Sequence, residues 1–209
     1  MLTLILDLDN TIYPVSSIAD ELFSPLFSLL ADSRFKLEHS VIDDAKQDIM
    51  RIPFQKVSAK YNFPHQLTEE AMTLLRNAVF EKKMTYYDDY NFIRELKARK
   101  FLLTTGFLKL QQSKIKCLGI ESDFEEICIV DPDRSSDTKK DIMERLIDKY
   151  RFNPEDILVV GDDPESEIKA ASELGLKSFL LDKTGRYDDI KTATFKGKSL
   201  EEVGFILKA

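Results

Sequence analysis

The sequence predicts an α/β fold in three layers, a parallel sheet between two layers of helices, with a group of helices inserted into the chain. Two observations predict it. Short apolar runs alternate with stretches of helical periodicity in the second half of the 209-residue chain, and strands that alternate with helices build βαβ units. About ninety residues separate the first apolar run from the second, far more than one crossover needs.

The first strand is predicted at Leu2 to Leu6, an unbroken apolar run that is typical of a buried parallel strand. Asp7-Leu8-Asp9-Asn10-Thr11 follows it directly. Because open α/β sheets bind ligands at the carboxyl ends of their strands, we expect the carboxylates of Asp7 and Asp9 to face such a crevice. An ordinary Asx turn is the alternative interpretation.

The insertion is predicted to be helical. Its helix-like stretches are Ile18 to Leu30, Val41 to Ile49 and Thr68 to Lys83, with breaks at Pro53 and Pro64. We expect residues 14–88 to form a cap subdomain over the carboxyl edge of the sheet, and residues 1–13 and 89–209 to form the core. Alternatively, these helices pack on the sheet as its ordinary layers.

The rest of the chain predicts the remaining strands and helices of the core. Further strands are expected at Phe101 to Leu103, Ile127 to Val130, Ile157 to Val160 and Ser178 to Leu181, and a short one near Ala193 to Phe195. Apolar residues on one face indicate two helices, the first through Ile142, Met143, Leu146, Ile147 and Tyr150 and the second through Ile168, Ala171 and Leu174. Ser199 and Glu202 have the capping-box spacing of a last helix.

The composition excludes several classes of protein. The net charge of −7 and the pI near 5.0 argue against nucleic-acid polymers and anionic membranes, which need a positive surface. No run reaches the ~18 apolar residues of a spanning helix, and the N-terminus lacks the basic region of a signal peptide. The cysteines and histidines are not spaced as zinc ligands: Cys117, Cys128, His39 and His65. We therefore expect a cytoplasmic protein.

Thr104-Thr105-Gly106 directly follows the second predicted strand. A hydroxyl group followed by flexible backbone at the start of a helix suits a bound anion, because free N–H groups and the helix dipole both favour negative charge. A Thr-Gly turn that only caps the helix is the alternative.

Lys139-Lys140 directly precedes the helix that carries Ile142. The helix dipole disfavours a cation at this end, so lysine here suggests a nearby anion or carboxylate, unless both side chains are simply exposed.

Acidic residues follow the predicted strand Ile157 to Val160, in the segment Gly161-Asp162-Asp163-Pro164-Glu165-Ser166-Glu167. Asp163 suits a helix N-cap and Pro164 a first turn, whereas Asp162 has no such structural use. If Asp162 faces Asp7 and Asp9, each close pair costs about 4 kcal/mol at 4 Å and an effective dielectric near 20. A divalent cation relieves this repulsion, and an all-oxygen site favours Mg²⁺.

These motifs, in this order, resemble those of the haloacid dehalogenase (HAD) superfamily of phosphohydrolases. The resemblance rests on Asp7-x-Asp9-x-Thr11, Thr104, Lys139, and Gly161-Asp162 with a trailing acid at Glu167. It implies a Rossmann-like core, and the position of the insertion resembles the C1-type helical cap. The stretch from Asp7 to Pro14 looks most like the pyrimidine 5′-nucleotidase-like branch.

The resemblance also implies a role for each residue. Asp7 would be the nucleophile and Asp9 the general acid, while Thr104 and the next amide would hold the phosphoryl group. Lys139 would neutralise charge, and Mg²⁺ would be bound by Asp7, Asp162 and the backbone carbonyl of Asp9. Further expected substrate contacts are those of Thr105, Gly106 and Tyr13, and other pocket residues could be Phe54, Lys56, Tyr86 and Tyr87. Thr11 would stabilise the turn.

The expected function is hydrolysis of a small phosphomonoester, such as a nucleoside monophosphate or sugar phosphate, through an aspartyl phosphate. Dehalogenases of the superfamily lack an acid equivalent to Asp9, which favours phosphoryl transfer. A β-phosphoglucomutase-like phosphotransferase, a receiver-like signalling module and a non-catalytic binding protein are the alternatives. Two choices stay open: Lys139 against Lys140, and Glu167 against Asp163 as support for the metal.

Overall fold

The computed structural model describes residues 1–187 and 189–206. Its sheet is parallel throughout, in the order β3-β2-β1-β4-β5-β6. The strands are β1 (Thr3–Leu6), β2 (Arg99–Thr105), β3 (Glu126–Val130), β4 (Ile157–Gly161), β5 (Lys177–Leu181) and β6 (Phe195–Gly197). The predicted α/β fold class is confirmed, and each predicted strand overlaps an observed one.

Strand β1 lies at the point where the order of the sheet reverses, between β2 and β4. The Asp7 N–H donates to the Val160 carbonyl at 2.9 Å, so Asp7 sits at the very end of the β1–β4 pairing. Ligands of open α/β sheets bind in the crevice at such a switch point. The topology therefore places Asp7 where a ligand would bind.

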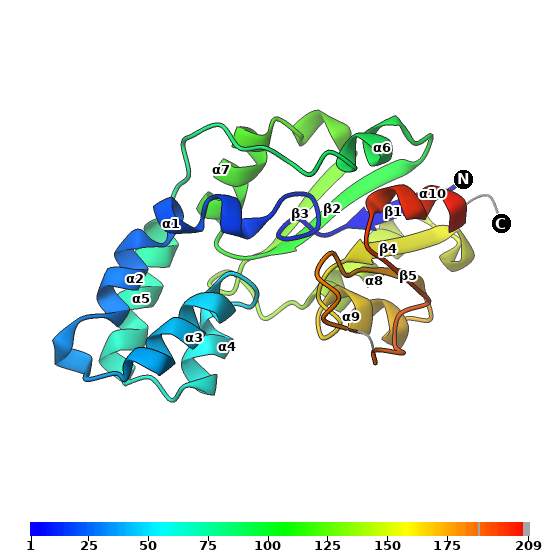
Figure 1. Ribbon diagram of the computed structural model, residues 1–209. Coiled ribbons are helices and arrows are strands. Elements are labelled where there is room, and N and C mark those ends of the chain that lie inside the picture. The colour runs from blue at the N-terminus through cyan, green and yellow to red at the C-terminus, as the bar shows by residue number, and fades with distance from the viewer. Residues whose placement is uncertain (188, 207–209) are drawn as a thin grey trace.

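Helices cover both faces of the sheet (Figure 1). Helices α6, α7 and α10 lie on one side and α8 and α9 on the other. Their bounds are α6 (Tyr90–Glu95), α7 (Leu108–Leu118), α8 (Lys139–Tyr150), α9 (Glu167–Glu173) and α10 (Val203–Ile206). Short 3-10 helices are Val15–Ser17, Ser33–Phe35, Glu121–Asp123, Pro154–Asp156 and Leu200–Glu202. The predicted capping box of Ser199 and Glu202 is present.

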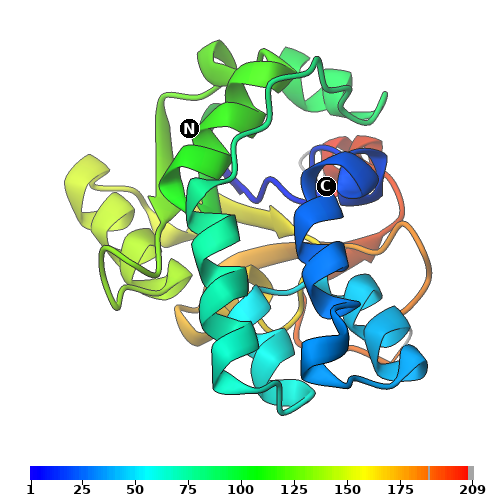
Figure 2. The same cartoon turned by 90° about the vertical axis from the view of Figure 1, so that its left-hand side faces the viewer.

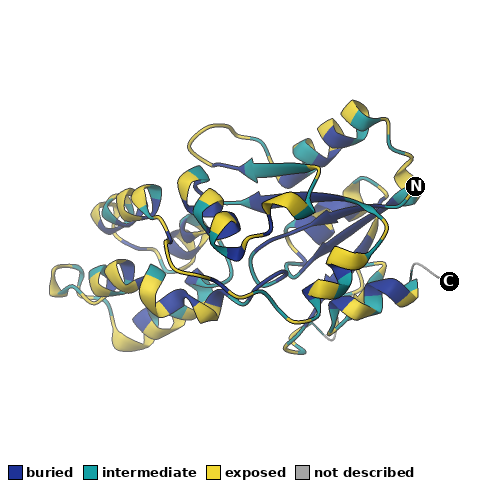
Figure 3. Ribbon diagram, turned by 90° about the horizontal axis from the view of Figure 1, so that it is seen from above, coloured by how far each residue is buried: buried dark blue, intermediate teal, exposed yellow. Residues whose placement is uncertain are grey.

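Alternate side chains of the strands fill two apolar clusters, and the central strands are buried along their length (Figure 3). Ile5 and Val159 pack with Met143 of α8 and Ala171 of α9. On the other face, Leu4, Leu6, Leu102 and Val160 join a larger cluster that continues into the helices of residues 14–88. Burial on both faces explains why these strands are continuously apolar in sequence.

The inserted helices lie together beyond the carboxyl edge of the sheet, and α2 packs along α5 (Figure 2). They are α1 (Ala19–Leu22), α2 (Ser24–Leu30), α3 (His39–Ile49), α4 (Phe54–Lys60) and α5 (His65–Asn77). Pro53 and Pro64 are the N-caps of α4 and α5, so the predicted breaks are helix starts. The separation of residues 14–88 as a cap subdomain stays a prediction.

Two inserted helices differ from their predicted lengths. The stretch Ile18 to Leu30 divides at Phe23 into α1 and α2. Helix α5 ends at Asn77 rather than near Lys83, because Ala78 is extended and the Phe80 N–H donates to Ser113 Oγ of α7 at 2.9 Å. The chain thus leaves α5 to run along α7. Within the described parts of the chain, we find no helix with the length and apolar character needed to cross a bilayer.

Candidate active site

A cavity of about 900 Å³ opens at the carboxyl edge of the sheet, between the strand ends and the inserted helices. Most of the residues predicted for the site line it: Asp7, Asp9, Thr104, Thr105, Gly106, Lys139, Asp162, Asp163 and Glu167. Its size lies within the usual range for small-molecule sites, roughly 300–1,000 Å³. The fold therefore brings motifs that are up to 160 residues apart in sequence, from Asp7 to Glu167, to one cavity.

The Asp7 carboxylate is buried, and Lys139 donates to its Oδ1 at 2.5 Å. The Thr11 hydroxyl lies 3.4 Å from its other oxygen, Oδ2, and donates to it. Burial raises the pKa of Asp7 to about 7, because the favourable charge of Lys139 is opposed by the negative charges of Glu167 and Asp9. Asp7 is thus a carboxylate whose charge is only partly balanced by this chain.

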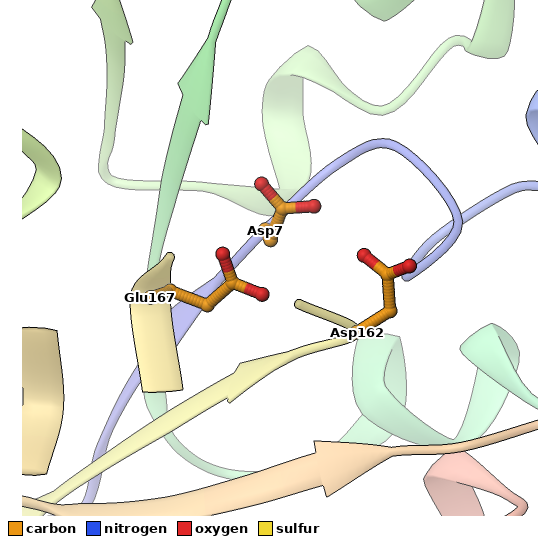
Figure 4. Close-up of side chains that lie close together, drawn as sticks. All are labelled: Asp7, Asp162 and Glu167. Atoms are coloured by element: carbon orange, nitrogen blue, oxygen red, sulfur yellow. The ribbon is translucent and has the colours of Figure 1, made fainter. Parts of the chain in front are cut away.

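Asp7, Asp162 and Glu167 direct their carboxylates toward a common space (Figure 4), where one oxygen of each lies within 4.8 Å of the others. Asp162 makes no side-chain hydrogen bond or ion pair within the described residues. Burial and the nearby charges of Glu167 and Asp7 raise the pKa of Asp162 well above its ordinary value. Three carboxylates and the single Lys139 ammonium leave a net charge of −2, which a divalent cation fits.

Glu167 is held by the protein itself on both of its carboxylate oxygens. Lys139 lies 2.7 Å from Oε2, and the Asp163 N–H donates to Oε1 at 2.9 Å. A side chain at Gly161 would place its Cβ only 2.0 Å from that Oε1, so the close approach of Glu167 requires glycine. Glu167 therefore supports Lys139 and the loop after β4, which leaves Asp162 as the available carboxylate.

The segment after β4 differs from its prediction in one detail. Helix α9 begins at Glu167 with Ser166 as N-cap, so Asp163 is not the helix N-cap and Pro164 lies in a preceding turn. Asp163 instead accepts from the Glu165 N–H at 2.9 Å. The helix thus starts three residues later than predicted, and its first residue, Glu167, accepts from the Asp163 N–H.

Lys139, rather than Lys140, is the lysine that contacts Asp7. It is the first residue of α8, whose N-cap Thr138 forms a capping box with Asp141. Its carboxylate partners Asp7 and Glu167 outweigh the effect of burial and raise the pKa of Lys139. Lys140 points elsewhere and pairs with Glu173 at 3.2 Å. Because the two carboxylates face it, the ammonium of Lys139 stays charged despite its burial.

Asp9 has a different set of partners. Lys114 Nζ lies 2.9 and 3.1 Å from its two carboxylate oxygens, Gln111 Nε2 donates to Oδ2 at 3.0 Å, and the Tyr13 hydroxyl donates to Oδ1. Burial alone would raise the pKa of Asp9, but Lys114, Tyr13 and Gln111 together hold it below its ordinary value. Asp9 is therefore fixed as an ionised carboxylate in this state.

Thr104, Thr105 and Gly106 turn from β2 toward α7 and line the cavity. Gln111 Nε2 donates to Thr104 Oγ1 at 2.7 Å, so the hydroxyl proton of Thr104 is free to point elsewhere. Gly106 has a φ of +151°, and the Gln111 side chain would lie only 3.1 Å from a Cβ at this position. The Leu108 N–H at the start of α7 already donates to the Asp131 carboxylate at 3.1 Å. The Thr104 hydroxyl is therefore a better hydrogen-bond donor for a bound anion than the N–H groups at the start of α7.

The sequence profile of the haloacid dehalogenase-like hydrolase family matches residues 1–175. The chain belongs to this family. Its curated relative N-acylneuraminate-9-phosphatase of Mus musculus is 27% identical over 124 residues, which make up 58% of this chain and 50% of that protein. The chain thus spans about half the length of the curated relative it matches.

Solved structures show the same fold over the whole length of this HAD-like hydrolase. The Bacillus subtilis protein YfnB, described as a HAD hydrolase bound to magnesium, superposes with a TM-score of 0.68 and 19% identity, covering 100% of this chain and 99% of that one. A haloacid dehalogenase-like family protein of Streptococcus pneumoniae has a TM-score of 0.73 and 17% identity, covering 99% and 98%. At these identities the likeness supports the fold alone.

Two site residues of this HAD-like hydrolase escaped the sequence analysis, Gln111 and Lys114. Both lie on the buried face of α7 with Leu110, Ile115 and Leu118. Their spacing of three residues places them side by side on that face. A glutamine and a lysine within an apolar helical stripe were the available signal, because buried lysine is rare unless it is paired.

Tyr13 lies in a different place from the one expected for a substrate contact. It has no exposed surface and is not part of the cavity wall. Burial, together with the charge of Asp9, raises the pKa of Tyr13 well above its ordinary value, so the phenol stays protonated and donates to Asp9. In this HAD-like hydrolase, Tyr13 thus reaches the cavity only through Asp9.

The inserted helices supply the opposite wall of the cavity. This wall is mostly apolar and includes Phe23, Ile49, Met50, Ile52, Phe54 and Leu75, together with the cationic side chains of Arg51 and Lys56. Phe54 and Lys56 therefore lie where pocket residues were expected, whereas Tyr86 and Tyr87 do not line this cavity. Asn10, with a φ of +58°, donates from Nδ2 to the Met50 carbonyl at 3.1 Å and ties this wall to the strand end.

Proposed function

We propose that this HAD-like hydrolase is a Mg²⁺-dependent phosphatase that hydrolyses a small phosphomonoester through an aspartyl phosphate on Asp7. One observation carries the proposal: Lys139 contacts Asp7 within the cavity, next to Asp162, which has no protein partner among the described residues. A carboxylate nucleophile repels a phosphate dianion unless cations offset the charge. Lys139 supplies one such cation at the point of attack.

In the first step, an oxygen of Asp7 attacks phosphorus, the new P–O bond forms, and the bond from phosphorus to the leaving oxygen breaks. Thr104 has a hydroxyl proton to donate to a phosphoryl oxygen, because Gln111 already donates to its Oγ1. Asp9, in its protonated form, gives a proton to the leaving oxygen and becomes the carboxylate. Its carboxylate lies at the cavity wall, between Asp7 and α7.

In the second step, Asp9 accepts a proton from water, and the resulting hydroxide attacks the phosphorus atom. The bond between phosphorus and Asp7 then breaks and restores the Asp7 carboxylate. The ionised form of Asp9, which Lys114, Tyr13 and Gln111 favour by lowering its pKa against the effect of burial, acts as the base in this step. The proton that Asp9 accepts from water is then available for the leaving group of the next substrate molecule.

The metal site of this proposal consists of Asp7, Asp162 and the backbone carbonyl of Asp9. Mg²⁺ would supply the charge that the three carboxylates lack and would bind phosphate oxygens when present. The all-oxygen donors and the unsatisfied Asp162 fit such an ion. Magnesium in the structure of the B. subtilis relative agrees with this choice.

The presence of Asp9 favours phosphate ester hydrolysis over dehalogenation, since a halide leaving group needs no proton. The curated relative is named as a phosphatase of a sugar-acid phosphate, which supports the same reaction class. We propose residues 14–88 as a cap that closes over the substrate, because they provide the apolar wall with Arg51 and Lys56. A nucleoside monophosphate or a sugar phosphate would match this mixed wall.

A screen of the full chain tests the proposal. Nucleoside monophosphates, sugar phosphates and sugar-acid phosphates are incubated with Mg²⁺ or with EDTA, and inorganic phosphate and phosphate esters are measured by ³¹P NMR. We expect Mg²⁺-dependent release of inorganic phosphate from at least one substrate group. Conversion to an isomeric ester would instead indicate a phosphomutase, and the absence of any reaction would contradict the proposal.

A further inference from the structure

Lys114 of helix α7 is a lysine on the buried, otherwise mostly apolar face of its helix. The side chain of Lys114 is 5% exposed, and its neighbours on the buried face are Leu110, Ile115 and Leu118. A buried ammonium is unfavourable unless it is paired and hydrogen-bonded. Lys114 therefore depends on a partner for its charge.

The carboxylate of Asp9 is the partner that Lys114 has within the described residues, and the contact is nearly symmetrical. Lys114 Nζ lies 2.9 Å from Oδ1 and 3.1 Å from Oδ2. Gln111, one turn earlier on the same face, adds a bond to Oδ2 and continues to Thr104 and to the Thr105 carbonyl at 3.2 Å. Helix α7 thus connects the Asp9 carboxylate rigidly to the end of β2.

The two partners differ in how far their side chains are exposed. The Asp9 side chain is 28% exposed and the Lys114 side chain 5%. Both side chains line the cavity, but Lys114 exposes far less of its surface there than Asp9 does, so the carboxylate is the more accessible partner to a substrate. Since catalytic groups must be held to within a fraction of an ångström of their productive geometry, a support of this kind controls where Asp9 can place a proton.

We propose that Lys114, assisted by Gln111, is a positioning residue that fixes the Asp9 carboxylate for proton transfer to the leaving group and from water. The proposal rests on the function proposed above for Asp9. Lys114 acts on the reaction only through Asp9. Chemistry at phosphorus itself, which involves Asp7 and Lys139, does not depend on it.

A mutant cycle with Lys114→Met tests this role. With an alkyl phosphate, whose leaving group needs a proton, we expect kcat to fall by about tenfold or more, since general acid catalysis contributes roughly 10²–10⁴-fold. With 2,4-dinitrophenyl phosphate, whose leaving group does not, we expect the rate of dinitrophenolate release in the first turnover, which reports formation of the aspartyl phosphate, to change by less than about threefold. KM for the alkyl phosphate should be unchanged. Lys114→Arg keeps the positive charge and should recover part of the lost kcat. The matched control is Lys116→Met on the exposed face of α7, which should leave kcat unchanged.

The second arm of the cycle places Lys114→Met in an Asp9→Asn background, with phenyl phosphate as substrate and circular dichroism as the check on folding. If Lys114 acts through Asp9, the added substitution changes kcat by less than about twofold there. An equal loss in both backgrounds, an equal loss for all leaving groups, or a rise in KM alone would overturn the proposal. A wild-type chain that hydrolyses no phosphomonoester would overturn the proposed function and this role with it.

Discussion

Asp7 and Asp9 leave the same strand end two residues apart, yet they lie in two unlike regions of the site. Asp7 faces the ends of β4, α8 and α9, where Asp162 and Glu167 add negative charge to that of Asp7 and only Lys139 opposes it. Asp9 faces α7, where Lys114, Gln111 and Tyr13 all donate to a single carboxylate. The region around Asp7 has more negative than positive side chains, whereas in the region around Asp9 the charge of Lys114 matches that of the single carboxylate.

The unequal surroundings assign unequal chemistry to identical side chains. Burial raises the pKa of Asp7 to about 7, whereas Lys114 and its neighbours outweigh burial and lower the pKa of Asp9. Environments that separate the pKa values of two carboxylates are the usual sign of divided roles. In the proposed function, the region around Asp7 would receive a cation and a phosphoryl group, and the region around Asp9 would hold a proton-transfer group in place.

The largest expected effect comes from a substitution in the region around Asp7. Asp7→Asn should lower kcat/KM for 4-nitrophenyl phosphate by about a thousandfold or more, because the amide cannot act as the nucleophile. The measurement is initial-rate kinetics, with an unchanged circular dichroism spectrum as the check on folding. Asp44→Asn, an exposed residue of α3, is the matched control and should keep full activity. Substantial activity in Asp7→Asn would show that another group attacks phosphorus.

Removal of the metal should give the next largest effect. Because Lys139 alone does not balance the three carboxylates, EDTA should lower the phosphatase rate by about a hundredfold or more, and added Mg²⁺ should restore it. Mg²⁺ should also raise the melting temperature of the wild type, since a ligand of the native state stabilises it. Asp162→Asn should abolish that rise. A full rise in this variant would place the ion at other ligands.

The region around Asp9 predicts a selective effect rather than a general one. Asp9→Ala should slow alkyl phosphates by about a hundredfold, whereas 2,4-dinitrophenyl phosphate should form its aspartyl phosphate at nearly the wild-type rate. The slope of log kcat/KM against leaving-group pKa, measured across a series of aryl and alkyl phosphates, reports the difference, because kcat/KM covers only the steps up to formation of the aspartyl phosphate. An equal slope in wild type and variant would mean that Asp9 does not protonate the leaving group.

The positions of the strands along the chain and the gathering of their ends could be predicted from sequence, because local patterns mark each strand. Continuous apolar runs marked the strands, and parallel strands carry their carboxyl ends to one edge. Thus Asp7, Thr104, Lys139 and Asp162 were expected together, and the structure places them in one cavity. Helices α4 and α6, with seven and six residues, were not predicted.

The partners of Asp9 could not be predicted, because they depend on packing rather than on a motif. Gln111 and Lys114 interrupt the apolar stripe of their helix, but only the docking of α7 beside the end of β1 shows that Asp9 is their partner. Tyr13 belongs to the opening motif, but only its complete burial separates a contact with Asp9 from one with a substrate. The choice between Lys139 and Lys140 likewise needed the direction in which α8 starts.

The smallest expected effect concerns stability in the absence of metal. The ordinary pKa of Asp7 is 3.8, and in the folded protein it is raised to about 7. Between these values the native state keeps a proton that the unfolded chain releases, so the contribution of Asp7 to stability falls as pH rises from about 4 to about 7. In Asp7→Asn this pH dependence is absent, and Lys139 still has Glu167 as a charged partner.

Asp7→Asn should therefore melt at a higher temperature than the wild type at pH 8 in EDTA, and the two should converge toward pH 4.5. A gain of about 1 kcal/mol corresponds to roughly 2–4 °C for a chain of this size. Differential scanning calorimetry across this pH range, repeated with Mg²⁺, measures it. Mg²⁺ should reverse the order, because it stabilises the ionised Asp7. A lower melting temperature for Asp7→Asn than for the wild type at pH 8 without metal would contradict this prediction. It would mean that the ion pair of Asp7 with Lys139 stabilises the fold more than the repulsion from Glu167 and Asp162 destabilises it, so that the ionised Asp7 would be stabilised by its surroundings, as Asp9 is.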